Sequence, residues 1–216
     1  MSFFSIGTLE LPPPHESWLL YERQPPGDGP PELRPAYRGL QCRKCRRVDE
    51  LQALQSGIHP EFRPPLSGVE AQTTDDGFLV VTRRVVEALL AIPSLDVRRF
   101  PVPASPDHFV LVPKRQFHPP LDARLYTPIE PPDPGDAFQV RGRRCARCQR
   151  HRTTTFWLER FEIPADVVLA GAMVEIGFPG VSVCWIASQA VADALRGFSG
   201  FDIKPADARL RLRRRP

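Results

Sequence analysis

The spacing of apolar residues is most regular in the section that begins at residue 78. Phe78 to Val81 is a continuous apolar run, which predicts a buried strand. Thr82 is a favourable helix N-cap, and apolar residues then recur with a period of about 3.6: Val85, Val86, Leu89, Leu90 and Ile92. Pro93 ends this helix, and alternation over residues 95–98 predicts a half-buried strand.

The last quarter of the chain repeats this pattern. Residues 184–187 predict a strand, Ser188 an N-cap, residues 191–198 a helical apolar stripe, and residues 201–204 a returning strand. A shift of 106 residues without gaps aligns the two sections and superimposes identical residues: Val85 and Val191, Ala88 and Ala194, Leu89 and Leu195, Asp96 and Asp202. The alignment indicates an internal duplication; the alternative is a chance likeness between two strand–helix–strand units.

Weaker signals lie outside these two sections. A short strand is predicted over residues 3–10, a short helix over 48–56 and a strand over 108–112, with proline-rich loops between them. We therefore expect an α+β protein with two related strand–helix–strand units. Three segments are expected: an N-terminal segment 1–60, a central unit 61–136, and a C-terminal unit 137–216 that ends in a basic tail.

Composition adds little, but the distribution of charge is informative. The chain has 26 prolines and 29 basic residues, nearly all of them arginine. Such a bias is also typical of GC-rich genomes, so the arginine content alone does not indicate nucleic-acid binding. Basic residues concentrate in 38–47, 141–152 and 209–215, which leaves 13 basic and 25 acidic residues elsewhere. An acidic body therefore carries two basic segments and a basic tail.

Each of the first two basic segments contains a C-x-x-C knuckle, Cys42 with Cys45 and Cys145 with Cys148. Together they would supply the four thiolates of a structural zinc site. The knuckles are 103 residues apart, so a shared metal would make the segment between them a domain-sized insertion in a split zinc ribbon. Two alternatives stay open, a redox role and separate knuckles. His151 is interpreted as solvated rather than as a ligand.

The sequence favours some functional classes over others. The opening residues lack a secretory signal, and no apolar run of about eighteen residues would span a membrane. Cysteines in metal-like pairs suit a reducing compartment, so we expect a cytoplasmic protein. The chain contains no H-E-x-x-H, P-loop or G-x-G-x-x-G motif. Because a four-sulfur zinc site leaves no open position for water, we expect no enzymatic activity.

One C-x-x-C near residue 40, another past the middle and a terminal strand–helix–strand unit together resemble the double-CXXCG motif immunity proteins. These are myxobacterial proteins encoded beside polymorphic toxins. The resemblance implies that Cys42, Cys45, Cys145 and Cys148 bind zinc, and that the chain neutralises a cognate toxin, often a nuclease. The family has glycine after each knuckle, which permits the positive φ that closes the turn. This chain has Arg46 and Gln149 there.

The acidic body suits an inhibitor that faces the phosphate-binding surface of a nuclease. Two acidic clusters are candidates for the partner-binding surface: Glu70, Asp75 and Asp76, and Glu130, Asp133 and Asp136. The alternative function is a zinc ribbon that binds nucleic acid through the basic segments beside the knuckles and through the arginine tail.

Overall fold

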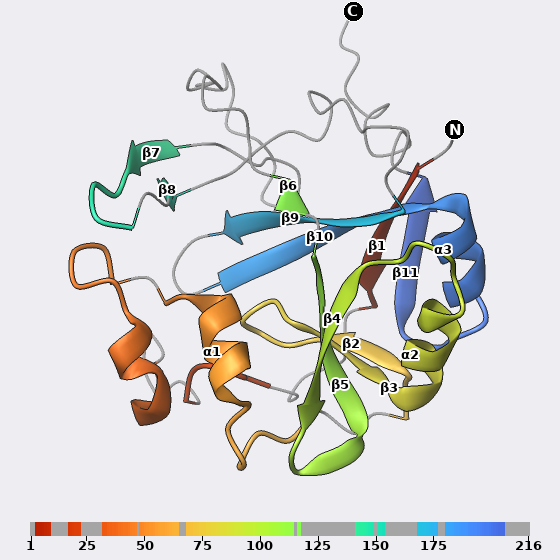
Figure 1. The fold of residues 1–216 in the computed structure, drawn as a ribbon, viewed down its shortest axis with the longest axis horizontal. Helices are drawn as coiled ribbons and strands as arrows, with labels where there is room; N and C mark the ends of the chain where they lie inside the picture. Colours follow the sequence, from red (N-terminus) through yellow and green to blue (C-terminus); the bar gives the residue numbers. More distant parts are fainter. Residues whose placement is uncertain are drawn as a thin grey trace, which may run out of the picture.

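The computed structural model describes residues 3–9, 17–22, 32–46, 48–64, 68–114, 116–117, 141–148, 151–153, 168–176 and 180–205. These residues form a mixed α+β fold with two main sheets, largely antiparallel, and few helices (Figure 1). The prediction of an α+β protein is therefore confirmed at this level.

The first sheet is antiparallel and contains the predicted apolar run at its centre. Its order is β2 (Ala71–Thr73), β3 (Leu79–Thr82), β5 (Ser105–Pro113) and β4 (Val97–Val102). The helix α2 (Arg83–Leu90) follows β3 directly, with Thr82 at the N-cap position but without a capping hydrogen bond from its hydroxyl. Residues Leu79 to Val81 of β3 are all apolar because alternate residues enter two different cores, Val81 one and Val80 the other.

The second sheet joins the start of the chain to its end. Its order is β11 (Phe201–Pro205), β1 (Phe3–Thr8), β10 (Gly180–Ser188), β9 (Leu169–Ile176) and β6 (Gln116–Phe117). All pairs are antiparallel except β6 with β9. The helix α3 (Gln189–Leu195) follows β10, again after an N-cap residue, Ser188, that makes no capping hydrogen bond. The N-terminal strand thus lies beside elements of the expected C-terminal unit.

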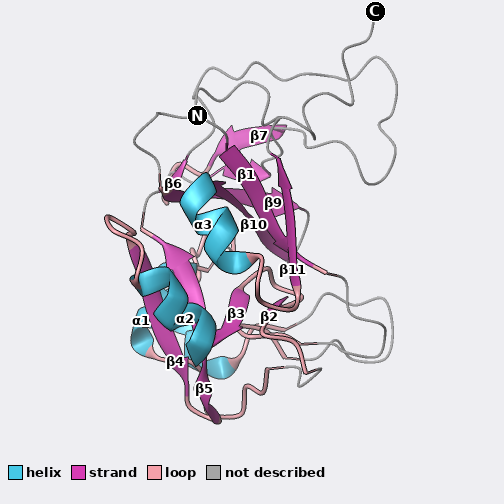
Figure 2. Ribbon diagram, turned by 90° about the vertical axis from the view of Figure 1, so that its right-hand side faces the viewer, coloured by secondary structure: helices cyan, strands magenta, loops and turns pink. Residues whose placement is uncertain are grey.

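One apolar core lies between the two sheets and includes both helices. The helices α2 and α3 contact each other and lie on the same side of the molecule (Figure 2). Val85, Val86, Leu89, Val191 and Leu195 of the predicted stripes are buried there, together with Ala192. Leu90, which the first stripe included, is 48 % exposed. Each large aliphatic side chain buried there contributes about 1.5–3 kcal/mol, so the helices hold the two sheets together.

The second apolar core lies on the other face of the first sheet. It is covered by residues 17–22, a 3₁₀ helix (η1, Pro35–Leu40) and the helix α1 (Glu50–Ser56). The Asp49 side chain caps α1 by accepting a hydrogen bond of 2.9 Å from the Gln52 backbone N–H. Residues 17–22, η1 and α1 therefore pack on the first sheet, although β1, which precedes them, belongs to the second.

A turn before β11 lies directly against β2 and links the sheets through backbone groups. The Glu70 N–H donates to the Ser199 carbonyl at 3.2 Å, and the Ser199 N–H donates to the Glu70 carboxylate at 3.1 Å. Gly200 follows, with φ +92°, and a Cβ added there would lie 2.1 Å from the carbonyl oxygen of Ala71. Only glycine fits this approach of two backbones.

Candidate metal centre

The four knuckle cysteines lie together in space. The Sγ atoms of Cys42 and Cys145 are 3.8 Å apart, those of Cys45 and Cys148 are 3.5 Å apart, and all four lie within 4.8 Å of one another. In the described part of the chain, this is the only group of three or more cysteine, histidine or acidic residues that could hold a metal ion. The two knuckles are therefore not separate in space, and their four cysteines form one possible metal site.

The first knuckle is anchored to the core beneath it. Gln41 and Val48 form an antiparallel bridge across its base, and the Arg46 N–H donates to the Cys42 carbonyl at 2.8 Å. Val48 is 2 % exposed and belongs to the second core, between η1 and α1. Packing of Val48 therefore fixes the position of the Cys42 and Cys45 thiols.

The second knuckle has the same construction. Cys145 and Cys148 lie in the turn between β7 (Arg141–Arg144) and β8 (His151–Thr153), where Arg144 pairs with His151. This pair and the Gln41–Val48 bridge are separated by 103 residues, the same offset as the cysteines. The first knuckle loop faces the β7–β8 hairpin (Figure 1). Two equivalent turns thus meet tip to tip.

Backbone groups in each turn stabilise the thiolate form of the cysteines. The N–H groups of Cys148 and Arg147 donate to the Cys145 sulfur and lower its pKa to about 6. Those of Cys45 and Lys44 lower the pKa of Cys42. A lowered pKa leaves more thiolate at neutral pH, and the thiolate is the form that binds metal.

The spacing of the sulfurs fits a tetrahedral metal site, and no disulfide joins the four cysteines in this structure. Bonds of about 2.3 Å from zinc to sulfur place the sulfurs of a regular tetrahedron about 3.8 Å apart. The distances of 3.5 and 3.8 Å across the knuckles match this value and are far longer than a disulfide bond of about 2.05 Å. All four cysteines are free thiols, and Cys145 is 1 % exposed.

Arg46 adopts the backbone conformation that the family pattern assigns to glycine. Its φ is +64°, in the left-handed region, so the first knuckle closes as the resemblance implies. A side chain in this conformation costs about 1–2 kcal/mol relative to glycine. The equivalent residue of the second knuckle, Gln149, lies outside the described residues, as does the histidine side chain of position 151.

Basic side chains surround the joined knuckles. Arg43, Lys44, Arg46 and Arg147 are all exposed, while the cysteines between them are buried or half-buried. A metal with four thiolates carries a net charge of −2, which these cations would balance. Because these cations are exposed, an external anion can also reach them.

The structure describes three of the six candidate partner-binding acids, Glu70, Asp75 and Asp76. Glu70 forms an ion pair with Arg84 at 2.7 Å and its side chain is 18 % exposed. The Asp75 carboxylate accepts a hydrogen bond from the Ser17 N–H. Glu130, Asp133 and Asp136 lie outside the described residues. The first cluster is therefore engaged within the fold.

The prediction that Asp76 contacts a partner is corrected, because this residue is buried and holds residues 17–22 onto the first sheet. It is 1 % exposed and accepts hydrogen bonds from Leu19 N–H at 3.0 Å, Leu20 N–H at 2.7 Å and the Thr74 hydroxyl at 2.6 Å. Such a side chain presents nothing to a partner. Asp76 lies in the turn between β2 and β3, and nothing in the local sequence indicates its buried contacts.

Replacing Asp76 with alanine is expected to lower the free energy of unfolding by about 2–4 kcal/mol, because two N–H groups and a hydroxyl lose their buried acceptor. Urea unfolding would measure this change. Asp107, with a side chain 80 % exposed and paired with Arg83, provides the control, and its replacement with alanine should change stability by less than about 0.5 kcal/mol. Equal effects at the two positions would contradict the assigned role of Asp76.

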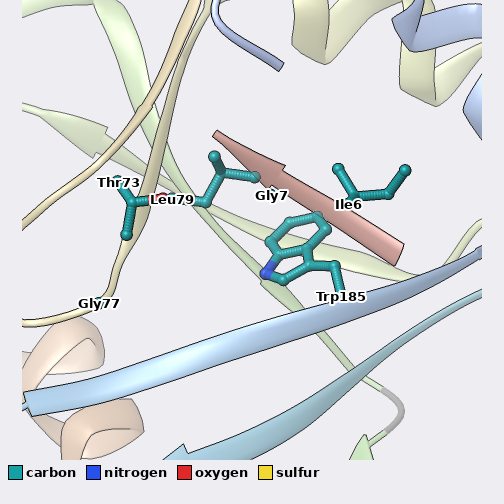
Figure 3. A pocket seen from close by; sticks show the side chains of 6 residues that line it. All are labelled: Ile6, Gly7, Thr73, Gly77, Leu79 and Trp185. Carbon is teal, nitrogen blue, oxygen red and sulfur yellow. The ribbon is translucent and has the colours of Figure 1, made fainter. Parts of the chain in front are cut away.

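A small cavity lies where the two sheets meet. It has a volume of about 10 Å³ and is lined by residues of β1, β3, β10 and the β2–β3 turn, among them Ile6, Leu79 and Trp185 (Figure 3). This volume holds about one water molecule, so the cavity is not a substrate site.

No helix in the described residues is long and apolar enough to cross a membrane. Comparisons with protein-family models, with curated proteins and with solved structures find no match to this chain.

Proposed function

We propose that this chain is a non-catalytic immunity protein, which binds and neutralises a cognate toxin in the cytoplasm of the producing cell. A structural zinc ion would hold its shape. The observation that carries the proposal is the set of four thiols, contributed by segments 103 residues apart and brought within 4.8 Å. A closed four-sulfur site favours a structural role over a catalytic one.

Zinc is the metal that these ligands favour. Thiolates select soft or borderline ions, and a tetrahedral four-sulfur arrangement is typical of zinc or of iron–sulfur centres. The match between the sulfur spacing and bonds of about 2.3 Å supports zinc. In this proposal, the zinc joins two related strand–helix–strand units derived from a duplication, as the offsets of 103 and 106 residues suggest.

The toxin-inhibiting role rests on the resemblance carried by the knuckles and the closing strand–helix–strand unit. It also fits the charge distribution, since the chain away from its basic segments is acidic. A nuclease that binds phosphate presents basic residues, and opposite fields accelerate association. With Asp76 buried, Glu130, Asp133 and Asp136 become the preferred candidates for this contact.

Co-expression with the product of the neighbouring gene tests the proposal. Cells that make the toxin should grow when they also make this chain, and the two proteins should purify as a complex. Reversing the charges of Glu130, Asp133 and Asp136 should slow association more at low salt than at high salt. Absence of both growth rescue and a complex would refute the proposal.

A second candidate function, nucleic-acid binding, is favoured by one observation. Four exposed cations, Arg43, Lys44, Arg46 and Arg147, surround the joined knuckles. If they contact phosphates, binding to generic DNA or RNA should weaken steeply with salt, with a log–log slope of about −0.7 to −0.9 per contact. Glutamine at Arg43 and Arg147 should then reduce the slope, whereas an immunity protein should show no such binding.

A further inference from the structure

The two sheets share one arrangement of four strands. The first has the order β2-β3-β5-β4, and the second contains the order β9-β10-β1-β11. In each, an antiparallel pair (β2 with β3, β9 with β10) is followed by a helix and then by an edge strand, β4 or β11. A fourth strand lies antiparallel between the second strand and the edge strand. That strand is β5 in the first sheet and β1 in the second.

The register of pairing shows that β1 occupies the position of β5. Thr82 pairs with His108, and Leu79 pairs with Leu111. At the 106-residue offset, Ser188 pairs with Phe3, and Trp185 pairs with Ile6. The same spacing along both ladders means that Phe3–Ile6 stand where residues 108–111 stand in the first sheet.

The two strands differ in how the chain connects them. β5 follows β4 after only two residues, Pro103 and Ala104. β1 lies at the opposite end of the sequence from its neighbours β10 and β11, and no hairpin ties it to either. After β1 the sequence continues through residues 9–16, which include three consecutive prolines, to Ser17. The Ser17 N–H donates to Asp75 in the turn between β2 and β3 of the first sheet. The second unit therefore takes its central strand from a distant part of the chain.

β1 is paired along both edges and buried on one face, as expected of a strand inserted between two others. Phe4 and Ile6 are 7 % and 3 % exposed and enter the core between the sheets. The Arg196 guanidinium lies 5.2 Å above the Phe4 ring. Both edges of β1 pair with other strands, over four residues with β10 and five with β11. Without β1, the second sheet would present a groove with two unpaired edges and an apolar floor.

We propose that β1 is an exchangeable donor strand, and that a second copy of this chain can supply its residues 3–8 to the groove between β10 and β11. The groove makes the same contacts whichever copy supplies the strand, so exchange costs no pairing energy. No short connection joins β1 to β10 or β11, so β1 can leave the groove without opening a hairpin. Residues 12–14 are three consecutive prolines, a sequence that generally favours extended conformations and so suits a connection between two copies.

A mixture of two full-length variants tests the exchange. One carries Ser5→Cys and the other Lys204→Cys, two residues that lie opposite each other on β1 and β11. After unfolding together, refolding with zinc and mild oxidation, only exchange between chains can join these positions. We expect a covalent heterodimer that increases with chain concentration, with the linkage identified by mass spectrometry of the joined peptides.

The first sheet provides the matched control. Arg98→Cys and Val112→Cys occupy opposite positions on β4 and β5, where the two-residue connection prevents exchange. The β1–β11 mixture should give several-fold more heterodimer than this control. A second pair, Thr8→Cys with Phe201→Cys, replaces the first if either variant fails to fold. Heterodimer no more abundant than in the control would overturn the proposal.

Discussion

Removing the metal from the purified protein is expected to lower the free energy of unfolding by about 4 kcal/mol or more, the stabilisation from a ligand held a thousand-fold above its dissociation constant. The reason is geometric. The four thiols lie within 4.8 Å, and they connect the turn at Cys42 to the hairpin at Cys145. Without a central ion, thiolates at this spacing repel one another, and the four bonds that joined the knuckles are lost.

Denaturant unfolding with and without a chelator measures this effect, and elemental analysis should give one zinc per chain. Cys42→Ser is the control, because a variant that has lost one sulfur should bind zinc weakly and respond little to the chelator. Identical unfolding of the wild-type protein in both conditions would show that the knuckles do not share a structural ion.

Replacing Gly200 with alanine is expected to destabilise the fold by about 4 kcal/mol or more, a loss seen only where a substitution cannot be accommodated. The new Cβ would lie 2.1 Å from the Ala71 carbonyl oxygen and 3.0 Å from its carbon, both backbone atoms. The residue also has φ +92°, which alanine rarely adopts. The turn would have to leave β2, with loss of the Glu70–Ser199 hydrogen bonds.

Gly197 provides the matched control three residues earlier. A Cβ added there meets no atom within 4 Å, and its φ is not in the left-handed region. Gly197→Ala should therefore leave the urea midpoint unchanged or slightly raise it, since alanine restricts the unfolded chain. Similar midpoints for the two variants would contradict the close approach of Gly200 to β2.

The elements that the sequence predicted best are those whose patterns are local. The helical stripes that became α2 and α3, and the apolar run that became β3, depend on spacing within about ten residues. The cysteine pairs were equally visible, because a C-x-x-C has a fixed geometry wherever it occurs. The cysteines were therefore identified as one candidate cluster before any fold was known.

Features that depend on distant partners were not predictable in the same way. The second sheet contains β9, whose Ala170, Gly171 and Ala172 lack the large residues that mark a strand. The pairing of β1 with β10 and β11 has no local signal, because the register is set by the opposite end of the chain. Asp76 was misassigned for the same reason, since its buried partners lie 56 and 57 residues away.

The position of β1 has a consequence for synthesis on the ribosome. β1 is synthesised roughly 170 residues before β10, a delay of about 10–35 s at typical elongation rates. During that interval Phe3, Phe4 and Ile6 lack their paired strands β10 and β11, so their backbone groups remain available to chaperones or to other nascent chains. The first sheet can assemble while translation continues, whereas the second must wait until β9, β10 and β11 have been made.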